Sequence, residues 1–168
     1  KRSNAQTLKR SNAQTLKRGK PESSQPRRTN EEVPEMSLSF HIGFNGQCEE
    51  AFNFYAYHLG AKIGTMLRVK DSPVPASSEA HGQKIVHANV CIDGVEIAGA
   101  DVDPDNYESP KGFCVLLGVD SEEKVKSFFN ALQEGGRVVL APQQTFWSPC
   151  YAIVVDRFGV PWKINYVT

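Results

Sequence analysis

An internal repeat is the feature that most restricts the fold of this 168-residue chain. An alternating apolar segment at 38–44 precedes a helical pattern and three strand-like segments, and the same order returns from residue 113 onwards. Gly43 and Gly60 lie 17 residues apart, as do Gly118 and Gly135. This matched order and spacing predicts two tandem βαβββ modules, at about 38–101 and 113–167, in an α+β fold.

The helix of the first module is marked by its apolar stripe and by both of its ends. Glu49 and Glu50 occupy the first turn, and Gly60 is expected to stop the helix. The stripe consists of Cys48, Ala51, Phe52, Tyr55 and Leu59. Three strands are expected to follow: 61–70, 84–92 and, after an Asp93-Gly94 hairpin turn, 95–101.

The second module shows the same signals. Asp120 and Glu123 have the spacing of a capping box, which predicts that the helix starts at Asp120, and Gly135 and Gly136 are expected to end it. The apolar stripe comprises Val125, Phe128, Phe129 and Leu132. Its strands are expected at 113–119, 137–146, 150–156 and 161–166.

Composition narrows the class of protein. Hydrophobic content of 40% is typical of a globular protein, and no apolar run approaches the roughly 18 residues that a membrane span needs. The four scattered cysteines have no metal-type spacing; buried free thiols in a reducing cytosol are favoured over disulfides or a metal site. Residues 37–168 hold ten Lys or Arg against fifteen Asp or Glu, which argues against a nucleic-acid surface there.

The first 35 residues differ from the rest of the chain. They begin with a perfect duplication of KRSNAQTL and contain one Val and two Leu, so they can bury almost no apolar surface and are expected to be disordered. Recurring Lys-Arg pairs are compatible with a nuclear-localisation or nucleic-acid arm. Apolar patterning begins only at Met36, which favours a vector-derived or upstream basic extension over 1–35, followed by one domain over 36–168.

Three motifs carry a resemblance to a known family: FNGQCEEAFNFYAYHLGAK, HANVCIDGVEIAGAD and DRFGVPWKINY. They cover essentially Leu38 to Val167 and resemble the PhnB-like branch of the vicinal oxygen chelate superfamily, to which glyoxalase I, bleomycin-resistance proteins and extradiol dioxygenases belong. The first and last motifs are the more specific. The resemblance implies a glyoxalase/bleomycin-resistance fold, in which a mixed sheet curls around a cleft. The branch's methyltransferase label gains no support, since no Gly-rich nucleotide loop is present.

The resemblance also implies where a metal site would lie. Metalloenzymes of the superfamily carry His in the first strand and Glu in the last strand of each module. The matching positions here are Leu38 or Phe40, then Phe113, Glu96 and Lys163. Three of these four slots offer no ligand, so we expect no metal and no cofactor.

Lys163 and Asn165 alternate with Trp162, Ile164 and Tyr166 along the last strand. The resemblance places the two polar residues toward the cleft, which is favoured over a rim position from which Lys163 merely reaches water. Glu96 is then the counterpart of Lys163, and the two are expected to form a direct or water-bridged pair across the cleft.

Other residues are weaker candidates. His41 has the opposite parity to Phe40, which favours a helix-face or interface position, and His87 shares a mixed polar face with Asn89 and Cys91. Trp147 lies in a loop, where it either lines an apolar pocket or caps the core. The Pro- and Ser-rich segment 69–84 reads as a long loop of the kind that forms lids or subunit contacts.

Four functions follow from these residues. The first is metal-independent binding of a small apolar or aromatic ligand, by Phe40, Glu96, Phe113, Trp147, Lys163 and Asn165. The second is an enzyme in which Glu96 is the base and Lys163 holds an anion. A metal-dependent lyase, isomerase or dioxygenase is disfavoured, and the fourth is interaction through the basic tail. We expect a cytoplasmic homodimer, since the strand edges carry few charges, with no membrane contact.

Overall fold

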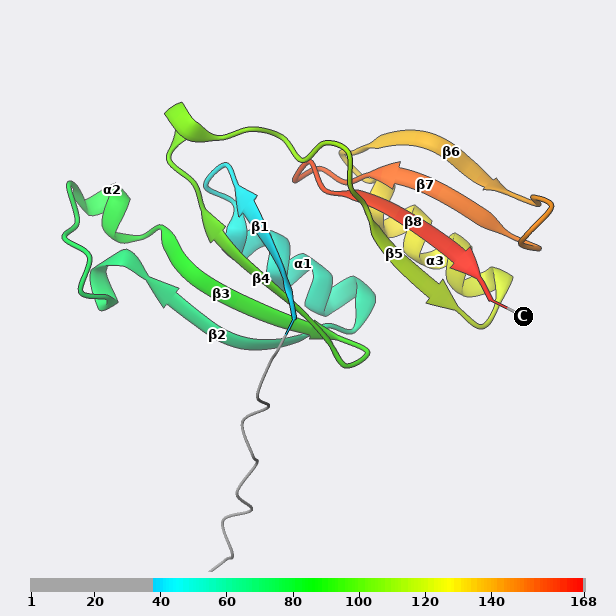
Figure 1. Cartoon of the computed structure of the whole chain (residues 1–168), viewed down its shortest axis with the longest axis horizontal. Helices are drawn as coiled ribbons and strands as arrows, with labels where there is room; N and C mark the ends of the chain where they lie inside the picture. The colour runs from blue at the N-terminus through cyan, green and yellow to red at the C-terminus, as the bar shows by residue number, and fades with distance from the viewer. Residues whose placement is uncertain (1–37, 168) are drawn as a thin grey trace, which may run out of the picture. The chain divides into compact units, whose positions relative to one another are not determined.

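The computed structural model describes residues 38–167, and the first module begins with a strand and a helix (Figure 1). Its elements are β1 (Phe40–Phe44), α1 (Cys48–Leu59), β2 (Lys62–Arg68), β3 (Ile85–Ile92) and β4 (Val95–Asp101). The apolar stripe of α1 is buried as expected. Gly60 ends the helix in the left-handed conformation, with φ of 70°, which glycine adopts without the steric cost that other residues incur.

The second module repeats this order of elements (Figure 1). It consists of β5 (Val115–Val119), α3 (Glu122–Gln133), β6 (Arg137–Gln143), β7 (Tyr151–Val155) and β8 (Pro161–Tyr166). The two βαβββ modules predicted from the sequence are therefore confirmed. The connection between them contains the short 3₁₀ helix η2 (Pro104–Asn106).

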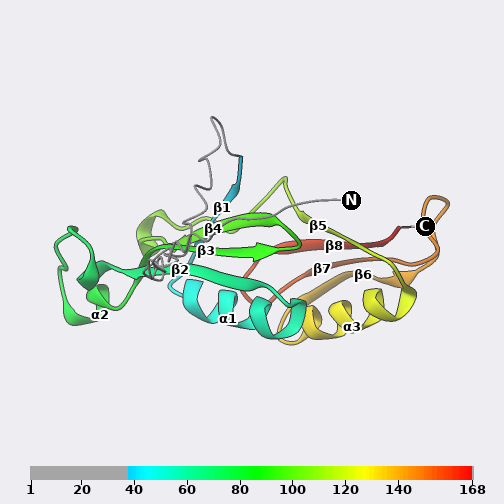
Figure 2. The same cartoon turned by 90° about the horizontal axis from the view of Figure 1, so that it is seen from below.

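Each module forms a four-stranded mixed sheet. The strand orders are β1-β4-β3-β2 and β5-β8-β7-β6, and in each sheet the first strand is parallel to the last strand of its module. The helix of each module covers one face of its own sheet, and the opposite face carries no helix (Figure 2). We call that uncovered side the open face.

The repeat extends to individual hydrogen bonds. Val102 donates its backbone N–H to the carbonyl of Phe44, and Val167 donates to the carbonyl of Val119, both at 2.8 Å. The register follows the same rule, since Gly43 pairs with Ala100 and Gly118 pairs with Asn165. Equivalent residues in the two modules can therefore be assigned from the structure, without counting along the sequence.

Several predicted boundaries were wrong. The first strand starts at Phe40 instead of residue 38, and β5 starts at Val115 instead of residue 113. The helix α3 is capped by Ser121, whose hydroxyl accepts from Lys124 N, and not by Asp120. The Asp120 carboxylate instead accepts a 2.8 Å hydrogen bond from Lys124 Nζ. Sequence spacing alone had not distinguished these adjacent capping side chains.

The predicted loop 69–84 contains two short helices, η1 (Val69–Asp71) and α2 (Glu79–Gly82). It is tied to α1 through Arg68, whose guanidinium contacts both carboxylate oxygens of Glu49 at 2.7 and 2.8 Å and the carbonyl of Gln83 at 2.9 Å. Asp101, at the end of β4, accepts from the backbone N–H groups of Cys48 and Ile85. These contacts fix the start of α1 against its sheet.

The two modules meet around one buried carboxylate, that of Asp156. It accepts from Tyr55 Oη at 2.7 Å, from Trp162 Nε1 at 2.8 Å and from the backbone N–H groups of Phe158 and Val160 at 2.9 Å. Tyr55 belongs to α1, whereas the other partners belong to the turn and strand of the second module. The rings of Tyr55 and Trp162 also pack edge to face, with centroids 5.2 Å apart. Aromatic packing and a fully used carboxylate therefore join the modules.

Candidate ligand-binding faces

The open face of the first sheet is polar. Lys62 pairs with Cys91 and Cys91 pairs with Glu96, so the three side chains form one row across three strands. Glu96 Oε2 accepts a 2.8 Å hydrogen bond from Asn89 Nδ2, and Asn89 Oδ1 in turn accepts from the N–H of Thr65. This chain of hydrogen bonds holds the Glu96 carboxylate on the open face.

The structure corrects the expected position of His41. His41 pairs with Ala98, two residues from Glu96 along β4, so it lies on the Glu96 face and not on the helix face. Phe40 shares its parity with Ile42 and Phe44, which are buried under the helix. Matching Phe40 to the family's metal-ligand position predicted that it faces the cleft. That prediction did not take into account that Ile42 and Phe44, on the same side of the strand, are core residues. His87 does share the open face with Asn89 and Cys91, as its parity predicted.

The counterpart assigned to Lys163 was also wrong. With Gly43 matched to Gly118, Lys163 corresponds to Ala98, and Glu96 corresponds to Pro161. The two turns differ in length, since β4 resumes directly after Gly94, whereas β8 begins only at Pro161. Counting from the turns therefore displaced the register by two residues while preserving which face each residue occupies. Within residues 38–167, no ion pair joins Glu96 to Lys163.

The open face of the second sheet carries Lys163 and Asn165 on β8, opposite to the helix side. Trp162 and Ile164 are fully buried on the helix side. Lys163 lies between Leu116 on β5 and Ile153 on β7, and Asn165 lies between Gly118 and Tyr151. The side-chain oxygen of Asn165 is buried, and it has no hydrogen-bond donor among the described residues. This face is thus mainly apolar, with one ammonium group at its centre.

Trp147 stands beside this face on a well-anchored loop. Its ring packs edge to face on Tyr151, with centroids 5.4 Å apart, yet 54% of the residue remains exposed. The neighbouring Ser148 is buried, and its hydroxyl lies within hydrogen-bond distance of the carbonyls of Cys150 and Tyr166. The backbone N–H of Thr145 donates to the carbonyl of Ser148. Trp147 therefore does not cap the core; it presents an exposed ring in a fixed position.

Phe40 and Phe113 both line a small apolar pocket of about 350 Å³. The β3–β4 turn region contributes Ile92, Val95 and Ile97, and the segment around β5 contributes Cys114 to Gly118. Phe113 precedes β5 and is not part of the strand. The structure therefore brings these two predicted ligand-binding residues together, but in a pocket that contains neither Glu96 nor Lys163.

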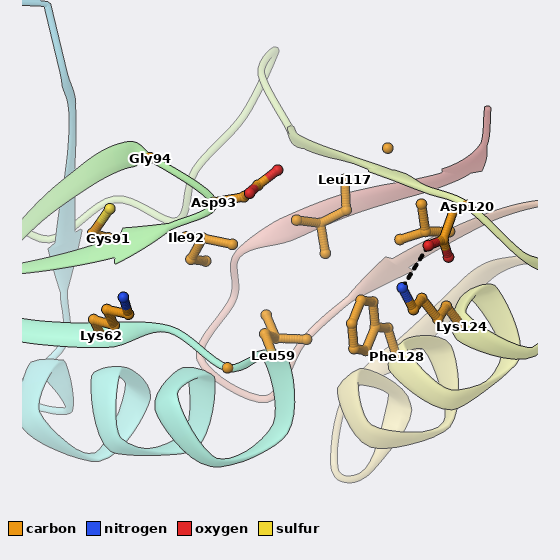
Figure 3. A pocket seen from close by; sticks show the side chains of 13 residues that line it. Leu59, Lys62, Cys91, Ile92, Asp93, Gly94, Leu117, Asp120, Lys124 and Phe128 are labelled. Atoms are coloured by element: carbon orange, nitrogen blue, oxygen red, sulfur yellow. Dashed lines mark hydrogen bonds and ion pairs between the residues drawn. The ribbon is translucent and has the colours of Figure 1, made fainter.

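A larger pocket, of about 680 Å³, lies between the β3–β4 turn and the start of α3 (Figure 3). Leu59, Leu117 and Phe128 contribute apolar side chains to it. Lys124 is paired with Asp120 at 2.8 Å, whereas Lys62 forms no ion pair within residues 38–167. The sequence had indicated none of these residues as a ligand site.

Comparisons with known proteins identify the family of this chain. The family model described as 3-demethylubiquinone-9 3-methyltransferase matches residues 36–165. Protein YjdN of Escherichia coli K12 is 34% identical over 141 residues, which cover 79% of this chain and 96% of that protein. The chain belongs to the family described by that model.

Solved structures place the family in a wider fold class. Protein PA1353 from Pseudomonas aeruginosa is 39% identical, with a TM-score of 0.71 over 77% of this chain and 98% of that one. A Bacillus cereus PhnB protein, titled as a putative 3-demethylubiquinone-9 3-methyltransferase, is 21% identical, with a TM-score of 0.68 over 79% and 100%. A glyoxalase/bleomycin resistance/dioxygenase family enzyme from Burkholderia phytofirmans, 16% identical over 77% and 97%, shares the fold at a TM-score of 0.55. This PhnB-like protein thus has the expected glyoxalase/bleomycin-resistance fold.

Metal-type donors do not converge in the described part of this PhnB-like chain. Within residues 38–167, no three His, Cys, Asp or Glu side chains lie close enough together to hold one ion. His41 and Glu96 share a face, but Asn89 already donates to the Glu96 carboxylate. Burial raises the pKa of the Cys48 thiol to about 12, so that it is protonated at neutral pH. No helix of the described residues is both long and apolar enough to cross a membrane.

The sequence did not indicate the cross-strand neighbours of Lys163 or the junction at Asp156. Leu116 and Ile153 flank the lysine only because β5 and β7 pair with β8, and no local sequence pattern indicates that pairing. The buried carboxylate did have a signal. Asp156 opens the turn of the DRFGVPWKINY motif, and Trp162 in the same motif supplies one of its donors.

Proposed function

We propose that this PhnB-like protein binds a small aromatic or apolar molecule on the open face of its second sheet, without a metal ion. The observation that carries the proposal is the exposed Trp147 ring, fixed on Tyr151 at the edge of that face. Leu116, 61% exposed, adds apolar surface beside Lys163. Binding sites for such ligands combine apolar and aromatic walls with a few polar groups that orient the molecule.

We also propose that two chains together complete the site. β1 and β5 are sheet edges, each with a strand on one side only, and Leu38, Phe40, Phe113 and Leu116 beside them are exposed. Unpaired edges with apolar side chains are normally covered. A homodimer would cover both the unpaired strand edges and the exposed apolar side chains. We place this dimer in the cytoplasm, where the four free cysteines would stay reduced. A dimer mass by light scattering at micromolar protein is expected, and a monomer mass would contradict it.

The binding proposal is tested by calorimetric titration with small aromatic compounds. The unaltered protein is expected to bind at least one, and Trp147→Ala to weaken that binding. The matched control is Tyr57→Ala, which removes an exposed aromatic ring from α1 of the first module. Elemental analysis is expected to find no stoichiometric transition metal. One transition metal per chain would contradict the metal-independent part of the proposal.

A second candidate function is an enzyme in which Glu96 acts as a base and Lys163 holds an anionic group. The observation that favours it is the Glu96 carboxylate, fixed by Asn89 on a face that also carries His41. No ion pair joins Glu96 to Lys163 within the described residues of one chain, so in this function each group would contact the substrate separately. Turnover abolished by Glu96→Gln, with ligand binding retained, would support catalysis over binding alone.

A further inference from the structure

The charged side chains that the strand register places on the open face of the second sheet are all basic. Across the sheet, the register aligns Leu116, Ile153 and Leu140 with Lys163, and Gly118, Tyr151 and Gln143 with Asn165. Arg137 lies at the corner of the same face, in register with Val155. Both charged side chains of this set are therefore basic. The open face of the first sheet, in contrast, carries both Lys62 and Glu96.

Lys163 has no counter-charge of its own among the described residues. It occupies a central strand, and its two cross-strand neighbours, Leu116 and Ile153, are aliphatic. Within residues 38–167, its ammonium group forms neither an ion pair nor a side-chain hydrogen bond. A cation set in apolar surroundings attracts an anion strongly, since the neighbouring side chains screen the charge less than water does.

We propose that the ligand of this face is an aromatic acid, that is, an aromatic ring bearing a carboxylate or a similar anionic group. This inference rests on the proposed function and specifies its ligand class. The ring packs against Trp147 and Leu116, and the anionic group is held by the Lys163 ammonium. An aromatic ring packs favourably on the indole of Trp147. A carboxylate forms a charge-assisted hydrogen bond with a lysine ammonium, which is stronger than a hydrogen bond between neutral groups.

Asn165 adds a hydrogen-bonding group beside the lysine. Residues two apart in a strand lie on one face about 6.6 Å from each other, which is close to the distance across a para-substituted benzene ring. The side-chain oxygen of Asn165 lacks a donor among the described residues. We expect the Asn165 side chain to rotate when the ligand binds, so that this oxygen accepts a hydrogen bond from a ring hydroxyl. Ring acids with a hydroxyl group opposite the carboxylate should then bind best.

The experiment compares three molecules of nearly equal shape that differ in charge: 2-naphthoate, 2-naphthamide and 2-naphthylmethylammonium. Their affinities for the full chain are measured by calorimetry, at low and at moderate salt. We expect the anion to bind at least tenfold more tightly than the amide, and the cation most weakly. Lys163→Met should reduce the affinity for naphthoate to that for the amide, while Lys163→Arg should retain most of the preference. Lys62→Met, on the other sheet, is the matched control and should change none of the three affinities.

The outcomes separate the inference from the function on which it rests. Equal binding of the anion and the amide, weakened for both by Trp147→Ala, would keep the proposed function and overturn the aromatic-acid assignment. A preference for naphthoate that survives Lys163→Met, or that is lost in Lys62→Met, would also overturn it. If none of the three compounds binds but another small aromatic compound does, the aromatic-acid assignment fails and the proposed function stands; if no aromatic compound binds, both fail. Thermal unfolding of each variant shows whether a lost affinity reflects a lost fold.

Discussion

The hairpin turn of the first module, Asp93-Gly94, lies at the surface with φ of 47° and 81°, values that Asp and Gly tolerate in a two-residue turn. The corresponding turn of the second module starts at Asp156, which is 3% exposed and accepts four hydrogen bonds. Both turns connect the last two strands of their modules. One closes its own hairpin only, whereas the other also binds α1 of the first module through Tyr55.

The same divergence separates the two open faces. The first sheet presents a hydrogen-bonded carboxylate beside polar and basic groups, and the second presents one central lysine among apolar side chains. The helix faces have stayed alike, since Ile97 and Trp162, which are equivalent by register, are both buried. The repeat therefore preserves what the backbone and the core require, while the turns and open faces differ in chemistry.

Asp156→Asn against Asp93→Asn is the strongest way to test this contrast between the turns. In Asp156→Asn, an NH₂ group replaces one acceptor oxygen and faces groups that are themselves donors, and the indole of Trp162 cannot accept a hydrogen bond. Leaving such buried donors unsatisfied should lower the free energy of unfolding by roughly 2–3 kcal/mol. Asp93→Asn is isosteric and exposed, and Asn tolerates positive φ. Urea unfolding of both variants measures the difference; equal losses would show that the buried turn has no special role.

The junction also shows why sequence reasoning succeeded only in part. The two modules, the helix stripes and the alternation of polar and apolar residues in β8 followed from residues near one another in sequence, such as Trp162, Lys163 and Ile164. The Tyr55–Asp156 contact joins residues 101 positions apart, and no local pattern encodes it. His41 was misplaced for a related reason. A strand's parity is decided by the core it packs on, and the buried residues Ile42 and Phe44 settle it here.

Gly43 and Gly118 provide a comparison at equivalent positions of β1 and β5. A Cβ added at Gly43 would lie 2.5 Å from Val102 Cγ2, whereas at Gly118 the distance to Val167 Cγ2 would be 3.1 Å. Gly43→Ala must displace Val102 and should destabilise the protein by about 1–2 kcal/mol. Gly118→Ala should be nearly neutral, because relief of glycine's conformational entropy offsets the milder contact. Thermal unfolding of the pair checks the order, and a larger loss for Gly118→Ala would contradict it.

The pH dependence of stability offers a smaller test of the Asp156 junction. Burial raises the pKa of Asp156 above its ordinary value of 3.8, although the hydrogen bonds from Tyr55, Trp162 and two backbone N–H groups oppose this shift. The folded protein therefore binds more protons at this group than the unfolded chain does between the two pKa values. Its contribution to stability is fully present below the unfolded pKa and is lost as pH rises through the folded pKa.

The measurement is the urea midpoint of the unaltered protein and of Asp156→Asn, followed upward from pH 3.8, the ordinary pKa. The difference in stability between them should shrink as the pH rises, because only the unaltered protein carries this titrating group. A difference that widens with rising pH would mean that the hydrogen bonds outweigh burial, and that the pKa is lowered.

Removal of residues 1–35 should have the smallest effect, since both modules and their contrasting turns lie after this segment. The segment contains one Val and two Leu, so its loss can remove little of the apolar burial that stabilises a fold. The contrast between the modules, and the ligand preference set by Lys163, should both persist in the shortened chain. The midpoint of thermal unfolding should stay within about 4 °C, which corresponds to roughly 1 kcal/mol or less for a domain of this size. A larger drop would show that the basic segment packs on the body and belongs to the folded unit.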